Sequence, residues 1–249
     1  MNADNVRSLC AALLLLAGPA VAQAPSPPET PAPLARRHFD VTRATSPIKV
    51  DGVLDEEAWK SALVVDLRYE WFPGDNTPPS VKTDALVTFD GEALYVAFRA
   101  EDPQPGTIRS HLMDRDAILA FNQDDHVGII LDTFNDERRA FQFRVNPLGV
   151  QVDATFSEID AAEDFSWDAI WASQGRITET GYVVEMAIPF KQLRFPRTEA
   201  PQTWGFEAFR SYPRSVRTRI SSKVTDRAKD CLLCQLDKVT GFSGIAPGR

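Results

Sequence analysis

Five acidic residues gather in one stretch of the sequence and could bind a metal ion: Asp124, Asp125, Asp132, Asp136 and Glu137. The hydrophobic residues among them predict a strand followed by a turn. Calcium takes about six to eight oxygen ligands in flexible geometry, which carboxylates and carbonyls supply. The stretch matches no calcium-loop motif of fixed spacing, so solvated acidic loops are the alternative interpretation. The candidate calcium ligands are Asp124, Asp125 and Asp132.

Two cysteines, Cys231 and Cys234, lie three positions apart late in the sequence. In an oxidising compartment such a pair can close into a small disulfide, which is the interpretation we favour. Two thiolates alone would not hold zinc, and the three histidines show no zinc-binding spacing. A thioredoxin-like redox site would need a β-α-β context, which this region lacks. The pair is therefore expected to staple a local loop.

The sequence contains few motifs that indicate catalysis. Residues 241–244 (Gly-Phe-Ser-Gly) lack the spacing of a nucleophile elbow. The many Asp and Glu residues leave a glycosidase carboxylate pair open, although each of them taken alone is more simply a loop or turn residue. No nucleic-acid partner is expected from a net charge of −8, because phosphate binding needs clustered Lys and Arg.

Residues 141–146 alternate strictly between hydrophobic and polar side chains, which predicts a strand with one buried face. The side chains expected to face the core are Phe141, Phe143 and Val145. The opposite face would carry Gln142, Arg144 and Asn146. Such a polar row could bind a ligand through hydrogen bonds. Alternatively, Arg144 could form a surface salt bridge.

The five tryptophans divide into one candidate for binding and four for packing. Trp71 lies in a turn-rich stretch, where an exposed aromatic ring is a candidate ligand platform. Trp167 and Trp171 lie four positions apart at the start of a predicted strand, and we interpret both as core residues. Trp59 and Trp204 are also expected in the core.

Most of the remaining chain predicts short strands separated by turns. An Asp-Gly-Glu turn at residues 90–92 joins an alternating strand at 85–89 to another at 93–100. Residues 127–134 are almost all hydrophobic, which is typical of a central strand. Further strands are predicted at residues 39–44, 150–156, 169–177, 182–188 and 204–210.

This pattern predicts an all-β fold, an antiparallel β-sandwich of jelly-roll or immunoglobulin-like type with one short helix. The helix is expected at residues 55–59, with Asp55 as its N-cap. A hydrophobic content of 43% with 15 Phe and 5 Trp is sufficient to fill the interior of a sandwich.

The N-terminal residues predict export. Arg7 followed by a hydrophobic run at residues 9–17 is typical of a signal peptide and too short to span a bilayer. Ala20 and Ala22 give the small-residue pattern for cleavage after residue 22, so residues 1–22 would be removed. A retained N-terminal anchor is the alternative.

Three further segments are predicted after that cleavage point. Residues 23–37 are rich in proline and predict an extended linker. Residues 38–212 are expected to form the sandwich. Residues 213–249 are expected to form a loosely held basic tail, because they are poor in core residues. Its cations are Arg214, Arg217, Arg219, Lys223, Arg227 and Lys229.

Several segments resemble, in order and spacing, the family 9 carbohydrate-binding modules. Residues 48–59 (Ile-Lys-Val-Asp-Gly-Val-Leu-Asp-Glu-Glu-Ala-Trp) resemble the opening motif of that family, and residues 93–98 resemble the strand that follows. The match continues through residues 125–132, 142–146 and 181–189. Two further segments are similar to a subgroup of large exported bacterial proteins with a barrel-like outer-membrane half; they are residues 146–154 and 167–171.

The resemblance implies a jelly-roll-like sandwich that binds sugars, often with structural calcium. In sugar-binding members two tryptophans sandwich a sugar ring, and an arginine that matches Arg144 donates hydrogen bonds to it. Residues 121–124 stand where the first tryptophan would be, so Phe121 is the remaining candidate platform, with Asn122 beside it. The second tryptophan has no counterpart near Cys231 and Cys234.

We therefore expect an exported, non-catalytic domain of the periplasm or outer membrane that binds a glycan or oligosaccharide. It would require no cofactor, with calcium as a candidate structural ion. One alternative is an envelope scaffold or plug whose partner is an outer-membrane barrel in the same chain, since residues 236–249 resemble the junction to such a half. Another is a glycoside-hydrolase component acting on O-glycosyl bonds. The candidate ligand residues are Arg144, Phe121, Asn122, Gln142, Asn146 and Trp71.

Overall fold

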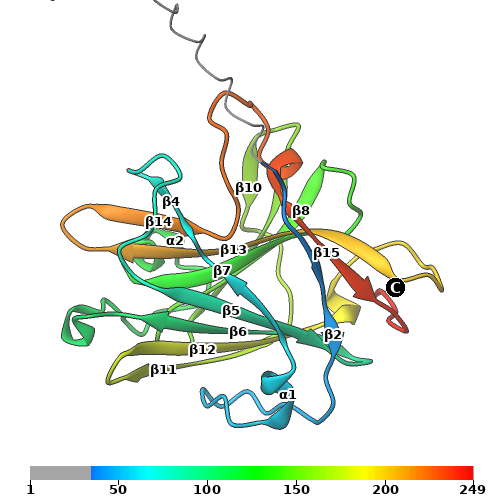
Figure 1. Cartoon of the computed structure of the whole chain (residues 1–249), viewed down its shortest axis with the longest axis horizontal. Helices are drawn as coiled ribbons and strands as arrows, with labels where there is room; N and C mark the ends of the chain where they lie inside the picture. Colours follow the sequence, from blue (N-terminus) through cyan, green and yellow to red (C-terminus); the bar gives the residue numbers. More distant parts are fainter. Residues whose placement is uncertain (1–34, 249) are drawn as a thin grey trace, which may run out of the picture. The chain divides into compact units, whose positions relative to one another are not determined.

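The computed structural model describes residues 35–248, which form two packed β-sheets (Figure 1). The predicted signal peptide and the linker up to residue 34 lie outside the described residues. Within the described part of the chain, no helix is both long enough and apolar enough to span a membrane. The predicted β-sandwich is confirmed.

The first sheet has nine strands and is built around β13 and β7. Its order is β1-β15-β13-β7-β8-β9-β10, and β14 pairs with the far end of β13 and with β4. The strands are β1 (His38–Asp40), β4 (Tyr69–Phe72), β7 (His126–Asp132), β8 (Arg139–Val145), β9 (Gln151–Ser157), β10 (Ala162–Asp164), β13 (Gln202–Pro213), β14 (Arg217–Ser221) and β15 (Asp237–Phe242). As predicted, the hydrophobic β7 is central.

The second sheet has six strands in the order β11-β12-β6-β5-β2, with β3 also paired to β5. They are β2 (Thr42–Arg43), β3 (Leu63–Asp66), β5 (Thr83–Phe89), β6 (Ala93–Glu101), β11 (Ala172–Thr178) and β12 (Gly181–Pro189). Neighbouring strands are antiparallel, except that β1 pairs in parallel with β15 and β2 with β5. The segment containing β1 and β2 therefore joins the edges of both sheets.

The core fills the space between the sheets with the inward side chains of alternating strands. Ile129 on β7, Phe143 on β8 and Val184 on β12 are completely buried there. Trp204 stacks on Phe242 with ring centroids 4.2 Å apart. Trp167 and Trp171 both contact the ring of Phe143, which confirms their interpretation as core residues.

The helices within residues 35–248 are short, and they number two rather than the predicted one: α1 (Glu57–Lys60) and α2 (Ile118–Phe121). Three 3-10 turns accompany them, η1 (Pro105–Thr107), η2 (Phe190–Gln192) and η3 (Leu233–Gln235). The prediction that Asp55 caps α1 is wrong. The N-cap is Glu56 without a side-chain cap bond, because Ser46 Oγ instead accepts the Ala58 N–H at 3.1 Å.

A buried carboxylate explains the sequence motif at residues 48–59. Glu185 on β12 accepts the backbone N–H groups of Asp51 (2.9 Å) and Gly52 (2.6 Å) and the indole N–H of Trp59 (3.1 Å). Gly52 has a φ of +81°, which a glycine adopts at low cost. Burial raises the pKa of the Glu185 carboxyl. The motif thus anchors α1 and Trp59 on the outer face of the six-stranded sheet, against Leu86.

The prediction that the chain after Tyr212 forms a loosely held tail is wrong for the described residues. Strands β14 and β15 both pair with β13, and their hydrophobic side chains Ile220, Val239 and Phe242 are buried. Between these strands, residues 222–236 pack Leu233 and Leu236 against Ile130 and Ala140, on the outer face of the nine-stranded sheet. The segment is polar because it borders a groove, as described next.

Candidate functional site

A groove of about 670 Å³ lies on the outer face of the nine-stranded sheet. Its floor consists of side chains that alternate with core residues on β7, β8 and β13, so strand geometry alone directs them outward. They are His126, Ile130, Gln142, Arg144 and Phe209. The volume is within the range of sites that take small ligands.

Two walls rise from opposite sides of this floor. One is formed by β4 and β14, which bring Trp71, Arg217 and Arg219 to the groove. The Arg219 guanidinium lies 5.4 Å from the centroid of the Trp71 ring. The other wall is formed by the end of β9 and the turn into β10, including Glu158 and Glu163. The groove therefore offers aromatic, amide and charged groups together.

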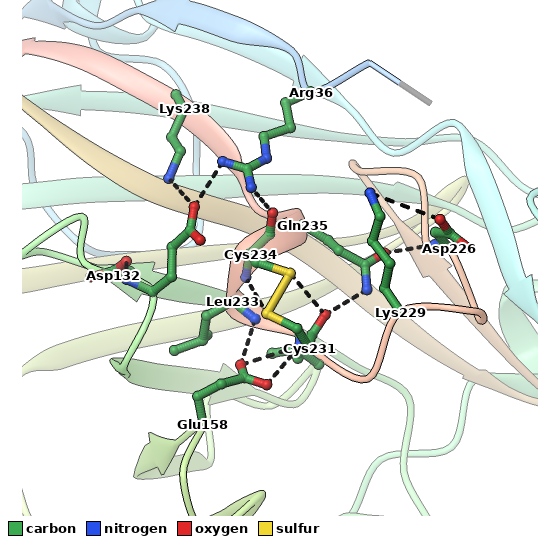
Figure 2. The surroundings of a disulfide bond; sticks show 12 residues. Arg36, Asp132, Glu158, Asp226, Lys229, Cys231, Leu233, Cys234, Gln235 and Lys238 are labelled. Carbon is green, nitrogen blue, oxygen red and sulfur yellow. Dashed lines mark hydrogen bonds and ion pairs between the residues drawn. A yellow bond between two sulfur atoms is a disulfide. The ribbon is translucent and has the colours of Figure 1, made fainter. Parts of the chain in front are cut away.

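The third border is the segment joining β14 to β15, which lies beside β10 in Figure 1. Figure 2 shows its disulfide between Cys231 and Cys234. The Glu158 carboxylate accepts the N–H groups of Leu232 and Leu233, and Gln235 Nε2 donates to the Cys231 carbonyl at 2.6 Å. Cys231, Leu232 and Gln235 line the groove. The disulfide thus holds a loop at the groove border.

Arg144 combines the two roles that the sequence left open. It forms an ion pair with Glu163 and a hydrogen bond to Gln142 Oε1, and it also lines the groove. Its guanidinium lies 5.9 Å from the centroid of the Phe209 ring and 5.6 Å from that of Phe165. Its buried Nε has no hydrogen-bond partner among the described residues.

Four of the six predicted ligand residues line the groove: Trp71, Asn122, Gln142 and Arg144. Phe121 does not, because its ring is fully buried 4.8 Å from that of His126, so a platform role is wrong for it.

Asn146, the sixth predicted residue, is also turned away from the groove. Its amide donates to Asp124 Oδ2 (3.0 Å) and to the His111 carbonyl (2.9 Å), and it accepts two backbone N–H groups. Strand β8 ends at Val145, so the alternation that directs Gln142 and Arg144 outward no longer applies to Asn146. Its prediction as a ligand residue is wrong for this geometric reason.

Several groove residues were missed because they come from the predicted tail. Arg217 and Arg219 alternate with Thr218 and precede the buried Ile220, a short strand signal that the surrounding charges obscured. Lys223, Arg227 and Lys229 follow them along the groove border.

Positive charge determines the electrostatics of the floor. Burial, together with the charges of Arg144, Arg217 and Arg219, lowers the pKa of His126 to about 3. Its Nδ1 lies 3.1 Å from the Asp124 carbonyl, which only accepts, so Nδ1 carries the proton and the ring is neutral. Partial withdrawal from water, followed by the charges of Arg217 and Arg144, lowers the pKa of the Arg219 guanidinium.

The three predicted calcium ligands are each engaged elsewhere. Asp124 binds the His111 N–H and ring, and Asp125 accepts from Arg214 at 2.8 Å. Asp132 accepts the Glu137 N–H at 2.8 Å. The set close enough to share an ion among the described residues is a different one, Asp116, Asp153 and Asp168. Calcium binding by this chain stays a prediction.

The fold is thus a β-sandwich of two mainly antiparallel sheets, with an open groove lined by aromatic, amide and guanidinium groups. The model of the carbohydrate family 9 binding domain-like family matches residues 50–220, and the chain belongs to this family. The search of curated proteins found no match.

Solved structures share the fold at low sequence identity. A family 9 carbohydrate-binding module from Caldicellulosiruptor kristjanssonii in complex with cellotriose has a TM-score of 0.55 and 18% identity, over 86% of this chain and 95% of that one. Its glucose complex gives 0.56 and 18%, over 83% and 96%. A structure described as that of a carbohydrate-binding protein from Bacteroides uniformis gives 0.63 and 9%, over 84% and 100%.

Proposed function

We propose that this chain is a non-catalytic carbohydrate-binding domain whose ligand occupies the groove above β7, β8 and β13. One observation carries the proposal: Trp71, Asn122 and the β8 pair Gln142 and Arg144 come from three separate segments, yet all line one groove. Sugars present both hydroxyl groups and apolar ring faces. A site with a few placed polar groups beside aromatic side chains is suited to bind them.

The carboxylates of the groove support binding over hydrolysis. Glu158 holds two backbone N–H groups of the disulfide loop, and Glu163 is paired with Arg144. Glu207 accepts from Ser221 at 2.7 Å and lies 3.6 Å from Lys223. Glycoside hydrolysis needs one carboxyl to give a proton and another to act as base or nucleophile. Carboxylates occupied in this way are better suited to shaping the groove.

The comparisons add support at the level of the family. Two of the solved structures with this fold are complexes with cellotriose and glucose. The groove of this chain is lined by one tryptophan, Trp71, together with Phe156 and Phe209. We propose glycan binding for this chain, with a specificity determined by its own groove residues.

Replacing Arg144 tests the proposal. The full chain is first screened on an array of neutral and acidic glycans, and binding of the strongest ligand is then measured by calorimetry. A hydrogen bond from a charged group contributes about 1.5–3 kcal/mol, so Arg144→Ala should weaken binding about ten- to a hundredfold. Its thermal midpoint should change little, because its partner Glu163 is partly exposed and can be hydrated when the ion pair is lost.

Arg139→Ala is the matched control. Arg139 is an exposed arginine at the start of the same strand and does not line the groove, so its loss should leave affinity unchanged. Equal weakening by both substitutions would contradict the assignment of Arg144. Absence of any glycan ligand on the array would contradict the proposed function itself.

We further propose that the chain is exported to the periplasm or outer membrane and loses residues 1–22 there. The proposal rests on Arg7, the hydrophobic run at residues 9–17 and the small residues before Gln23. Mass spectrometry of the periplasmic fraction should find Gln23 as the first residue. Retention of Met1 in the mature protein would contradict it. A role as plug or scaffold for an outer-membrane barrel remains the alternative, which binding to membrane protein alone would favour.

A further inference from the structure

The groove concentrates positive charge in a chain whose net charge is −8. Apart from the buried Arg210, six cationic residues line it, and they come from β8, β14 and the segment after β14. They are Arg144, Arg217, Arg219, Lys223, Arg227 and Lys229. Five acidic residues also line the groove, so basic residues are in excess there; the acidic residues are Glu158, Glu163, Glu207, Asp226 and Asp230. Because the rest of the chain carries an excess of acid, this face differs in sign from the molecule as a whole.

Four of these cations have a carboxylate within 4 Å. Arg144 pairs with Glu163, and three further pairs join Lys223 to Glu207 (3.6 Å), Lys229 to Asp226 (3.8 Å) and Arg227 to Asp75 (3.7 Å). Arg217 and Arg219 have no such partner among the described residues. Arg217 donates to the Asn122 carbonyl, and Arg219 lies over the Trp71 ring.

The arginines lie close enough to one another to repel. The charges of Arg217 and Arg144 both act on Arg219, and all three act on His126. Like charges brought together cost free energy, and an anion placed among these guanidinium groups would offset that cost.

We infer that the groove recognises an acidic saccharide, whose oxyanion lies between Arg144, Arg217 and Arg219 while a sugar ring contacts Trp71. This inference rests on the proposed glycan-binding function and specifies its ligand class. Guanidinium groups bind carboxylates and other oxyanions through paired hydrogen bonds. A uronate carboxylate and a sulfate ester share this chemistry. Glu163, on the exposed strand β10, occupies Arg144 when the ligand is absent and is displaced when it binds.

The test compares three probes by calorimetry with the full chain: trigalacturonate, a galactose oligosaccharide that bears sulfate esters without uronate, and neutral cellotriose. We expect at least one acidic probe to bind ten times more tightly than cellotriose, and the stronger of the two identifies the oxyanion. Arg219→Ala and Arg217→Ala should each weaken acidic binding about tenfold while changing cellotriose binding less than threefold.

A gain of affinity provides the sharper test. Glu163→Gln removes the competing carboxylate and should tighten acidic binding about threefold or more. Glu179→Gln makes the same charge change at an exposed position between β11 and β12, and it should have no effect. Binding of cellotriose as tightly as the acidic probes would overturn the inference and leave the proposed function intact. Binding of no saccharide on the glycan array would overturn both.

Discussion

Arginines lie on both faces of the β13–β14 hairpin, and the two faces differ in whether carboxylates pair with these arginines. On the inner face, Arg210 and Arg214 meet Asp102 and Asp125, four charged groups that are buried or nearly so. On the outer face, Arg217 and Arg219 face the groove without carboxylate partners within the described chain. Arginine thus occurs once in a closed network, where carboxylates neutralise it, and once in an open groove, where no carboxylate of the described residues pairs with it.

The inner network is arranged for stability. Burial alone would lower the pKa of Arg214, but its hydrogen bond to Asp125 and the charges of Asp125 and Asp102 raise it. Arg210, completely buried, donates to Thr83 Oγ1 (2.9 Å) and to the Glu101 carbonyl (2.8 Å) on the opposite sheet. These bonds join the two sheets. The outer arginines make no comparable bond between the sheets. We therefore attribute their mutual repulsion, which costs free energy in the ligand-free fold, to a role in binding the proposed ligand.

The largest expected effect comes from opening the inner network. Among the described residues, Arg214→Ala leaves Arg210 as the one cationic side chain beside the buried carboxylates of Asp102 and Asp125, at 3.9 and 4.0 Å. Removing one partner of a buried charge pair costs about 3–5 kcal/mol. We expect a loss of about 3 kcal/mol in the free energy of unfolding, measured by urea titration.

Arg217→Ala is the matched change on the outer face, three residues further along the chain. Because Arg217 has no ionic partner, its loss should cost less than about 1 kcal/mol of stability, while acidic glycan binding weakens. The comparison fails if both variants lose the same stability, or if Arg214→Ala reduces ligand affinity as strongly as Arg217→Ala does.

A second effect, comparable in size over several pH units, concerns pH. His126 has a pKa of about 3 in the folded chain because it is buried below the three arginines, against about 6.5 when unfolded. Above a pH of about 6.5 the ring is neutral in both the folded and the unfolded state. Below it only the unfolded chain takes up the proton, so stability falls as the pH drops toward 3, by about 1.4 kcal/mol per pH unit.

The variant His126→Gln isolates this contribution. Burial raises the pKa of Asp125, which opposes the trend by favouring the folded state in acid, but that effect is common to both proteins and cancels in the difference. Unfolding titrations between pH 7 and pH 4 should therefore show a shallower decline for the variant. Parallel curves would mean that His126 is protonated within the folded groove.

The smallest expected effect is that of salt. Charges that border an open groove are screened by mobile ions, whereas a closed network is screened much less. Raising NaCl from 50 to 500 mM should weaken binding of an acidic saccharide about threefold and leave cellotriose binding unchanged. Calorimetry at both concentrations measures this directly. Equal salt dependence of the two ligands would contradict an ionic role for the groove arginines.

The sequence alone determined the main strands of both sheets and four residues of the groove. Alternation assigned Phe143 to the core and directed Gln142 and Arg144 outward, because side chains of a strand point to opposite faces in turn. The hydrophobic run of β7 marked the central strand for the same local reason. Hairpin signals such as Asp90, whose carboxylate accepts the N–H groups of Glu92 and Ala93, are also local and were read correctly.

Only the tertiary structure decided what the polar segments do. Residues 213–249 are charged and predict a solvated tail, yet β14 and β15 enter the sheet, because pairing partners on β13 satisfy their backbone groups. Asn146 and Phe121 were predicted to contact the ligand but are buried. The direction of the Asn146 side chain depends on where strand β8 ends, and that of Phe121 depends on a helix turn. The groove unites Trp71, Arg144 and Arg219 across long sequence separations, and that proximity is a property of the packed sheets.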